Sequence, residues 1–178
     1  PVGEEETLET LNINTIGTHN ILKHFTQAKI ILTSTCKSCN PETVYGASKL
    51  IAERLTLNAD HSVARFYNVV ETSGNIFEIW NNCEPKKVVE KCNRYFISLD
   101  EAVGLIFHAM KSESGRYSVN PGKILNMKEI FISIYGQESY ISIEPRRGDR
   151  VSEVLHSTSE FIESNSGSIL KIKSHHDL

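Results

Sequence analysis

Tyr45 and Lys49 are the residues whose types and spacing point most directly to catalysis. They stand four residues apart in the run YGASK, so in a helix both side chains lie on one face. The ammonium group of a neighbouring lysine favours the phenolate and would lower the pKa of the tyrosine from about 10 toward neutrality. Such a pair predicts a general acid and base. Spacing alone leaves one alternative, an amphipathic helix whose lysine extends along its surface.

Two hydroxyl residues, Ser34 and Thr35, end a predicted strand just upstream of this pair. The run KIILTST over 29–35 is short, apolar and rich in β-branched residues, which is typical of a strand inside a sheet. Ligands of open α/β sheets bind beyond the carboxyl ends of the strands. We therefore expect Thr35 to reach the same place as Tyr45.

Helices and strands alternate along the rest of the chain. Hydrophobic periodicity predicts helices over residues 4–27, 43–58, 74–83, 99–111 and 126–135. Strands are predicted over residues 29–35, 61–67, 94–98, 115–119 and 139–144. This alternation favours an α/β fold with a parallel sheet. From Ser164 onward the chain is rich in Ser, Gly, Lys and His, and we expect it to fray.

Composition excludes several classes of protein. The chain has 178 residues, 39% of them hydrophobic, and a net charge of -3, as in an ordinary globular domain. A nucleic-acid partner would call for a basic excess that is absent. The apolar runs are a few residues long, far short of a bilayer span, so we expect no membrane contact from this segment.

The four cysteines indicate a reducing compartment. Cys36 and Cys39 have C-x-x-C spacing, which is compatible with zinc or a redox pair. Cys83 and Cys92 are nine residues apart, however, and the adjacent His175–His176 do not readily share one tetrahedral metal. We therefore predict free thiols, no metal site and a cytoplasmic location.

Five segments, in the right order, resemble one enzyme family. Residues 33–55, TSTCKSCNPETVYGASKLIAERL, resemble the active-site segment of the extended short-chain dehydrogenase/reductases. The resemblance is strongest to the nucleotide-sugar (UDP-N-acetylglucosamine) 4,6-dehydratase branch of polysaccharide biosynthesis, whose members read S-T-D-K-A-x-N-P-x-x-x-Y-G-A-T-K. Family motifs are also matched by NINTIGTHNIL over 12–22, RFYNV over 65–69, RYFISLDEAV over 94–103 and RRGDRVSEV over 146–154.

The resemblance implies a Rossmann-like, doubly wound parallel sheet, NAD or NADP as cofactor and a UDP-sugar as substrate. The G-x-G-x-x-G turn that holds a dinucleotide pyrophosphate is absent from the sequence. We therefore expect an incomplete Rossmann-like fold with a small C-terminal substrate-binding α/β part. The expected division is 1–72 for the second half of the dinucleotide-binding domain, 73–164 mostly for substrate binding, and 165–178 as a flexible tail. A fragment, the ordered portion of a longer chain and a natural remnant all remain open.

The family's catalytic roles transfer to residues of the 33–55 segment. The resemblance implies that Tyr45 takes the proton of the sugar C4 hydroxyl while hydride passes to the nicotinamide. Lys49 would hydrogen-bond the nicotinamide ribose, and Thr35 the substrate hydroxyl. Lys37 occupies the position of the base that removes the C5 proton. From spacing alone, Lys37 is equally well a solvated loop lysine.

Substrate-binding roles fall on four later residues. Asn68 matches a substrate-contacting asparagine of the family. Arg94, Arg146 and Glu153 match positions that hold the nucleotide diphosphate and ribose, and a guanidinium suits a diphosphate through its two-pronged geometry. For Asn68, Arg94 and Arg146 a structural or merely exposed role is the alternative.

Cys36 departs from the family pattern. It stands where the dehydratases carry an aspartate, the acid expected to help expel the C6 hydroxyl. A thiol with a pKa near 8.5 donates a proton but provides no carboxylate at neutral pH. Oxidation at C4 by Tyr45 is therefore expected, whereas elimination is in question.

Two functions of different classes follow. The first is an NAD(P)-dependent nucleotide-sugar dehydratase or epimerase acting in polysaccharide or glycan precursor biosynthesis. The second is a catalytically inactive remnant or fragment that keeps UDP-sugar binding or dimerisation. In this superfamily the helix of the Tyr–Lys pair packs with the preceding helix at a dimer interface, which implies a homodimer through helices 4–27 and 43–58.

Overall fold

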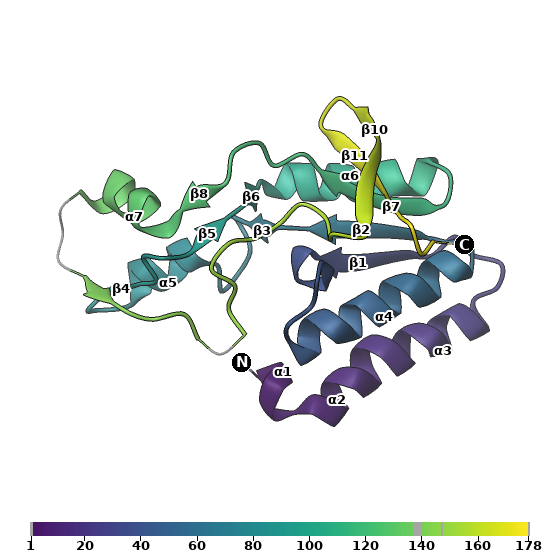
Figure 1. The fold of residues 1–178 in the computed structure, drawn as a ribbon, viewed down its shortest axis with the longest axis horizontal. Helices are drawn as coiled ribbons and strands as arrows, with labels where there is room; N and C mark the ends of the chain where they lie inside the picture. Colours follow the sequence, from purple (N-terminus) through teal and green to yellow (C-terminus); the bar gives the residue numbers. More distant parts are fainter. Residues whose placement is uncertain (1, 137–139, 147, 178) are drawn as a thin grey trace.

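A five-stranded sheet forms the centre of the molecule (Figure 1). The computed structural model describes residues 2–136, 140–146 and 148–177. In spatial order the strands are β1 (Ile31–Thr35), β2 (Ser62–Phe66), β7 (Gly115–Val119), β11 (Ile169–Ser174) and β10 (Glu160–Ser166). The first three strands are parallel, and the β10–β11 hairpin joins them antiparallel to β7.

Helices cover both faces of this sheet, which confirms the expected doubly wound α/β fold (Figure 1). One face carries α4 (Val44–Asn58) and, outside it, a helical run of α1 (Val2–Glu5), α2 (Thr7–Leu11), the π-helical turn η1 (Asn12–Ile16) and α3 (Gly17–His24). The other face carries α6 (Leu99–Lys111). A capping box of Ser98 and Glu101 begins α6, satisfying backbone donors that the first turn leaves free.

A smaller part adjoins the carboxyl ends of β1 and β2 (Figure 1). It contains α5 (Ile76–Asn82), α7 (Met127–Tyr135) and three short strand pairs. The pairs are β3 (Asn68–Val69) with β6 (Phe96–Ile97), β4 (Lys87–Val88) with β9 (Ile141–Ser142), and β5 (Asn93–Arg94) with β8 (Leu125–Asn126). Trp80 and Phe131, both 0% exposed, anchor its core. The predicted strand over 139–144 is reduced to β9, and residue 139 lies outside the described residues.

The two faces of the central sheet differ in chemistry. Toward α6 the sheet is largely apolar, with Ala64 and Val119 packed against Leu105. Because successive residues of a strand point to opposite faces, the intervening positions face α4. Those positions include Ser34 on β1, paired in register with Arg65 on β2.

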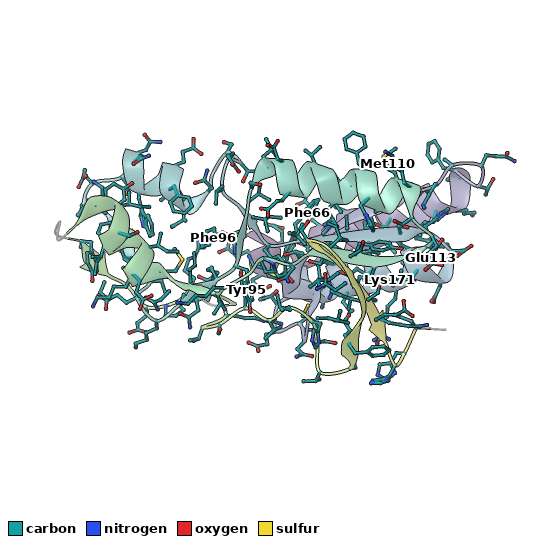
Figure 2. All side chains as sticks on the ribbon, turned by 90° about the horizontal axis from the view of Figure 1, so that it is seen from above. Phe66, Tyr95, Phe96, Met110, Glu113 and Lys171 are labelled. Atoms are coloured by element: carbon teal, nitrogen blue, oxygen red, sulfur yellow. The ribbon has the colours of Figure 1, made fainter. Side chains whose placement is uncertain are left out.

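The expected flexible tail over 165–178 is wrong, because residues 160–174 form the β10–β11 hairpin. Leu170 and Ile172 are each 2% exposed, and Ile169–Ile172 of β11 pair with β7. Lys171 also forms an ion pair with Glu113 (Figure 2). Composition misleads here because the few buried apolar side chains of the hairpin, Leu170 and Ile172, stand among serines, lysines and other polar residues. Residue 178 lies outside the described residues.

The other domain boundaries stay a prediction. Strand β7 lies within 73–164 yet belongs to the central sheet, and helix α6, also within 73–164, packs on that sheet. Met110 of α6 faces away from the strands and is 51% exposed (Figure 2). In the described part of the chain, no helix combines the length and the apolar character that crossing a bilayer requires.

Candidate active site

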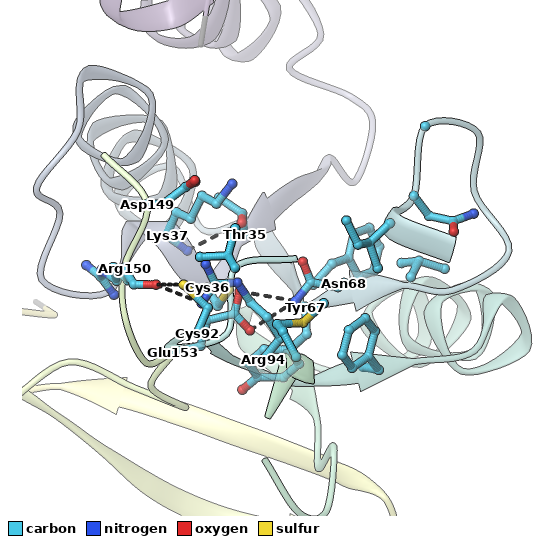
Figure 3. Close-up of a pocket in the computed structure, with 18 of the residues that line it drawn as sticks. Thr35, Cys36, Lys37, Tyr67, Asn68, Cys92, Arg94, Asp149, Arg150 and Glu153 are labelled. Atoms are coloured by element: carbon cyan, nitrogen blue, oxygen red, sulfur yellow. Dashed lines mark hydrogen bonds and ion pairs between the residues drawn. The ribbon is translucent and has the colours of Figure 1, made fainter. Parts of the chain in front are cut away.

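An open cavity of about 540 Å³ lies at the carboxyl ends of β1 and β2, next to the smaller part (Figure 3). The short 3-10 turn η2 (Cys36–Ser38) lines one side. Another side is lined by Arg146, Gly148, Asp149, Arg150 and Glu153. Of the nine residues predicted from the sequence, eight line this cavity: Thr35, Cys36, Lys37, Tyr45, Asn68, Arg94, Arg146 and Glu153. The ninth, Lys49, lies behind it on α4.

Tyr45 enters the cavity from the first turn of α4. Thr43 caps this helix, accepting a hydrogen bond from the Gly46 amide at 3.0 Å. A Cβ atom on Gly46 would lie 2.4 Å from the Lys37 carbonyl oxygen, so only glycine lets η2 approach the helix this closely. As a result, Lys37 Nζ lies 5.9 Å from the centre of the Tyr45 ring, within the range of a cation–π interaction.

Lys49 does not act on Tyr45 as the spacing predicts. Its Nζ donates to the Thr33 carbonyl at 2.8 Å, toward the sheet. Burial raises the pKa of Tyr45, and the Cys36 sulfur adds to the rise. The predicted lowering of the Tyr45 pKa is therefore wrong for this structure. Burial also lowers the pKa of Lys49, against the opposing charge of Glu53.

Cys36 is a buried, protonated thiol. Its side chain is 3% exposed, and burial, with the charge of Glu153 second, raises its pKa to about 12. The thiol consequently keeps its proton at neutral pH. Next to it, the Thr35 hydroxyl accepts a hydrogen bond from the Lys37 amide at 3.3 Å and also interacts with the Cys36 sulfur.

Glu153 organises the opposite wall of the cavity (Figure 3). Its two carboxylate oxygens lie 3.1 and 3.0 Å from Asn68 Nδ2, and one of them accepts from the Tyr95 amide at 2.9 Å. Arg94 Nε lies 3.6 Å from the same carboxylate, and Arg94 Nη1 donates to the Arg150 carbonyl at 2.8 Å. Glu153 thus fixes Asn68 and Arg94 in place.

Two arginines lie at the rim. The Arg146 side chain is 73% exposed and pairs with Asp149 at 3.2 Å, so its guanidinium is accessible to an anion. Arg150, which was not among the predicted site residues, lines the cavity and donates to the carbonyls of Cys39 and Asn40. The sequence signal for Arg150 was its place in the basic cluster RRGDR.

Sequence reasoning also missed a buried acid behind the cavity. Glu53 follows Lys49 by one helical turn, is 0% exposed, and lies against Arg65 and Arg116. The available signal was a glutamate on the inward face of an amphipathic helix and an arginine inside each of two short strands. Among the described residues, no cluster of three or more His, Cys, Asp or Glu side chains is arranged to hold a metal.

Sequence comparison links the chain to a described family. The profile of a family described as "Polysaccharide biosynthesis protein" matches residues 1–173. The capsular polysaccharide biosynthesis protein CapD of Staphylococcus aureus is 30% identical over 90% of this chain and 31% of its own length. A UDP-N-acetylglucosamine 4,6-dehydratase (inverting) of Campylobacter jejuni is 26% identical over 90% of this chain and 54% of its own. The chain thus spans about a third to a half of these relatives.

Solved structures share the fold. Pen from Bacillus thuringiensis superposes with a TM-score of 0.82 at 23% identity, covering 98% of this chain and 62% of its own. MoeE5, solved in complex with UDP-glucose and NAD, gives a TM-score of 0.72 at 18% identity, covering 88% and 65%. At these identities the likeness establishes the Rossmann-type fold.

Proposed function

Because this chain belongs to the polysaccharide biosynthesis protein family, we propose that it carries the catalytic part of an NAD(P)-dependent nucleotide-sugar 4,6-dehydratase or epimerase. Within that family it belongs to the nucleotide-sugar dehydratase branch of the extended short-chain dehydrogenase/reductases. The observation that carries the proposal is the meeting of Tyr45, Thr35, Cys36 and Lys37 in one cavity at the carboxyl ends of β1 and β2.

Each of these residues has a role at the sugar ring. Tyr45 takes the proton of the C4 hydroxyl, and the Thr35 hydroxyl binds the same substrate oxygen. Lys37, beside the Tyr45 ring, is placed to remove the C5 proton, which becomes acidic next to a C4 ketone. A nicotinamide cofactor, when bound, supplies the hydride acceptor at C4.

The residues present fit the nicotinamide-ribose end of such a cofactor. The Lys49 ammonium has three donors, and one is used by the Thr33 carbonyl. The remaining donors suit ribose hydroxyls. A G-x-G-x-x-G turn for the pyrophosphate is not in this sequence, so the fit is limited to that end.

For the UDP-sugar, the exposed Arg146 and the fixed Arg94 suit the diphosphate. Asn68 and Glu153 supply polar groups for the sugar or ribose. The exposed apolar side chains of α2, η1 and α3 support a homodimer through these helices and α4. The four cysteines are unpaired, which is typical of the cytoplasm and supports that location.

A second candidate function has its own support. Cys36 replaces the family's acid, and burial raises rather than lowers the pKa of Tyr45. Both observations favour a catalytically inactive protein that retains UDP-sugar binding or dimerisation.

Turnover of UDP-N-acetylglucosamine by the protein expressed from its complete gene separates the two. We expect Tyr45→Phe to lower kcat by about 10²–10⁴-fold, the usual contribution of a general acid or base. Tyr135→Phe, which removes a hydroxyl hydrogen-bonded to Asn81 outside the cavity, should leave kcat unchanged. Equal turnover by Tyr45→Phe would overturn the role proposed for Tyr45 in the reaction. UDP-sugar binding without turnover by the parent would establish the second function.

A further inference from the structure

Four charged side chains are buried together between α4 and the central sheet. We call Glu53, Arg65, Arg116 and Glu160 the ionic cluster. Their side chains are between 0% and 3% exposed, and among the described residues every buried side-chain nitrogen and oxygen has a hydrogen-bond partner. The cluster lies outside the cavity, and the proposed reaction does not use its charges directly.

Glu53 is the centre of the ionic cluster. Its Oε1 lies 2.5 Å from Ser34 Oγ, 2.7 Å from Ser38 Oγ and 3.1 Å from Arg65 Nε. Its Oε2 accepts from Arg65 Nη2 at 2.6 Å and from Arg116 Nε at 3.0 Å. Burial opposes ionisation, but the two guanidiniums and the Ser34 hydroxyl hold the pKa of Glu53 below its ordinary value.

The two serines bracket the reactive segment. Ser34 immediately precedes Thr35, Cys36 and Lys37, and Ser38 immediately follows them. Glu53 also lies on α4 one turn after Lys49. One carboxylate therefore ties the end of β1 and both ends of the reactive segment to the helix that carries Tyr45.

Stability alone does not account for this arrangement. Burying charges carries a large desolvation cost, and well-packed apolar residues often stabilise a core as well as a buried ion pair does. Here the polar groups do something that apolar groups cannot, because they hold two specific hydroxyls at a fixed separation beside the cavity. A displacement of about 1 Å in a catalytic group is enough to cost about 10²-fold in rate.

We propose that Glu53 is a positioning residue that holds Thr35, Cys36 and Lys37 in register with Tyr45. The proposal rests on the function proposed above. Glu53 touches neither substrate nor cofactor and acts through Ser34 and Ser38.

Glu160 offers a matched control within the same cluster. Its carboxylate pairs with Arg65 through two contacts of 2.9 Å and accepts from the Ser157 amide at 2.7 Å. Its hydrogen bonds and ion pairs within the described chain run to Arg65, Arg116 and Ser157 rather than to residues 34–38. Glu160→Gln thus removes a buried charge of the same cluster without releasing the reactive segment.

The first measurement compares Glu53→Gln and Glu160→Gln in the protein expressed from its complete gene, below the melting temperature of both. We expect Glu53→Gln to lower kcat by about 10–100-fold, with KM for the UDP-sugar unchanged within about threefold. Glu160→Gln should keep kcat within about threefold, although it also lowers the melting temperature. Equal kcat losses in both variants, or no loss in Glu53→Gln, would overturn the proposal.

A second readout does not depend on turnover. Cys36 is 3% exposed and lies in the reactive segment, whereas Cys92 is 1% exposed and lies in the smaller part of the molecule. We expect Glu53→Gln to raise the rate of Cys36 alkylation at least about tenfold, followed by peptide mass spectrometry, without changing Cys92. If the parent shows no turnover, the proposed function fails while this arm still decides the positioning role. If Cys36 were alkylated at the same rate in Glu53→Gln as in the parent, the positioning role of Glu53 would be refuted.

Ser34→Ala and Ser38→Ala cover the case in which Glu53→Gln does not fold. Each removes one hydroxyl and leaves the ion pairs intact. We expect each to lower kcat by about threefold to tenfold or, in a protein without turnover, to speed Cys36 alkylation. Ser62→Ala, a buried serine at the other end of β2, should do neither. If both Ser34→Ala and Ser38→Ala kept the kcat and the Cys36 alkylation rate of the parent protein, the proposal would be wrong.

Discussion

Cys36 is the residue on which the outcome of the proposed reaction depends. Its pKa of about 12 keeps the thiol protonated throughout the neutral range, and its place at the end of β1 puts it beside Thr35 and Lys37. A carboxylic acid at that position is both a stronger acid and, once ionised, a base. In the proposed reaction, we therefore expect the residue at position 36 to affect expulsion of the C6 hydroxyl, while the C4 proton transfer belongs to Tyr45.

We predict that Cys36→Asp raises the ratio of elimination product to simple C4 oxidation product. The measurement is product analysis by mass spectrometry after incubation with UDP-N-acetylglucosamine and NAD(P). Cys36→Ser is the matched control, because it changes the side chain without adding a carboxyl group. A product ratio equal to that of the parent would show that position 36 is not the acid position.

At this scale the sequence brought together residues that line one cavity, while their roles as a site stay a prediction. Motif order places Thr35, Tyr45 and Asn68 correctly at one cavity. The direction of the Tyr45 pKa shift was missed because it depends on where the Lys49 ammonium points, and the Thr33 carbonyl that receives it is distant in the sequence. Glu53 was missed for the same reason, since its partners come from four separate elements.

Among the elements, the β10–β11 hairpin supplies a charged group to the core of the molecule. Strand β10 supplies Glu160, whose carboxylate neutralises the guanidiniums of Arg65 and Arg116. Burial alone would raise the pKa of Glu160, but the Arg65 guanidinium lowers it from 4.5 to about 2. The hairpin is therefore held to the sheet by charge as well as by backbone hydrogen bonds.

This shift predicts how stability depends on pH. A carboxyl group with a depressed native pKa stabilises the fold above its unfolded value and loses that contribution as pH falls through its native value. We expect Glu160 to contribute on the order of 3 kcal/mol above about pH 4.5, decreasing between pH 4.5 and 2.

Urea unfolding at pH 6 and pH 3 measures this contribution. Glu160→Gln should lower stability at pH 6 and reduce the difference between the two pH values. Glu129→Gln, on the exposed face of α7, should leave that difference unchanged. If residues 160–174 were a frayed tail, Glu160→Gln would have no effect at either pH.

Sequence periodicity was most reliable for elements with one apolar face. The helix over 99–111 and the strand over 115–119 coincide with α6 and β7, because both pack an apolar side on the core. The hairpin escaped detection because the two buried apolar side chains of β11, Leu170 and Ile172, stand among lysines and serines. The register of the hairpin is set by its pairing with β7, and the sequence of the hairpin itself does not predict that long-range pairing.

At the scale of the whole molecule, one helical surface carries apolar side chains that are exposed to solvent. Its members lie on α2, η1, α3 and the residue after α3, with exposures between 49% and 72%: Leu8, Ile13, Ile16, Ile21 and Phe25. The side chains of Asn14 and Thr15 hydrogen-bond to Ser48 on α4. The helical run is therefore firmly attached, and exposed apolar side chains gathered on one element are a feature of protein interfaces.

We predict that this surface forms the homodimer and that Ile16→Asp yields a monomer. A carboxylate in an apolar interface loses hydration without gaining a partner. Sedimentation velocity on the protein from its complete gene is the measurement. Ile134→Asp, at a similarly exposed isoleucine of α7, should leave the assembly unchanged. A monomeric parent, or an Ile16→Asp dimer, would contradict the prediction.

The ionic cluster also bears on the order in which the molecule is completed during synthesis. Its members come from positions 53, 65, 116 and 160, so both guanidiniums leave the ribosome before the second carboxylate does. A nascent chain that has reached only β7 has two cations to bury with one anion, and an unpaired buried charge is strongly disfavoured. We therefore expect α4 to close on the sheet only once β10 has been made. Translation past residue 160 thus becomes the step that completes a reaction centre whose reactive residues were all made more than a hundred residues earlier.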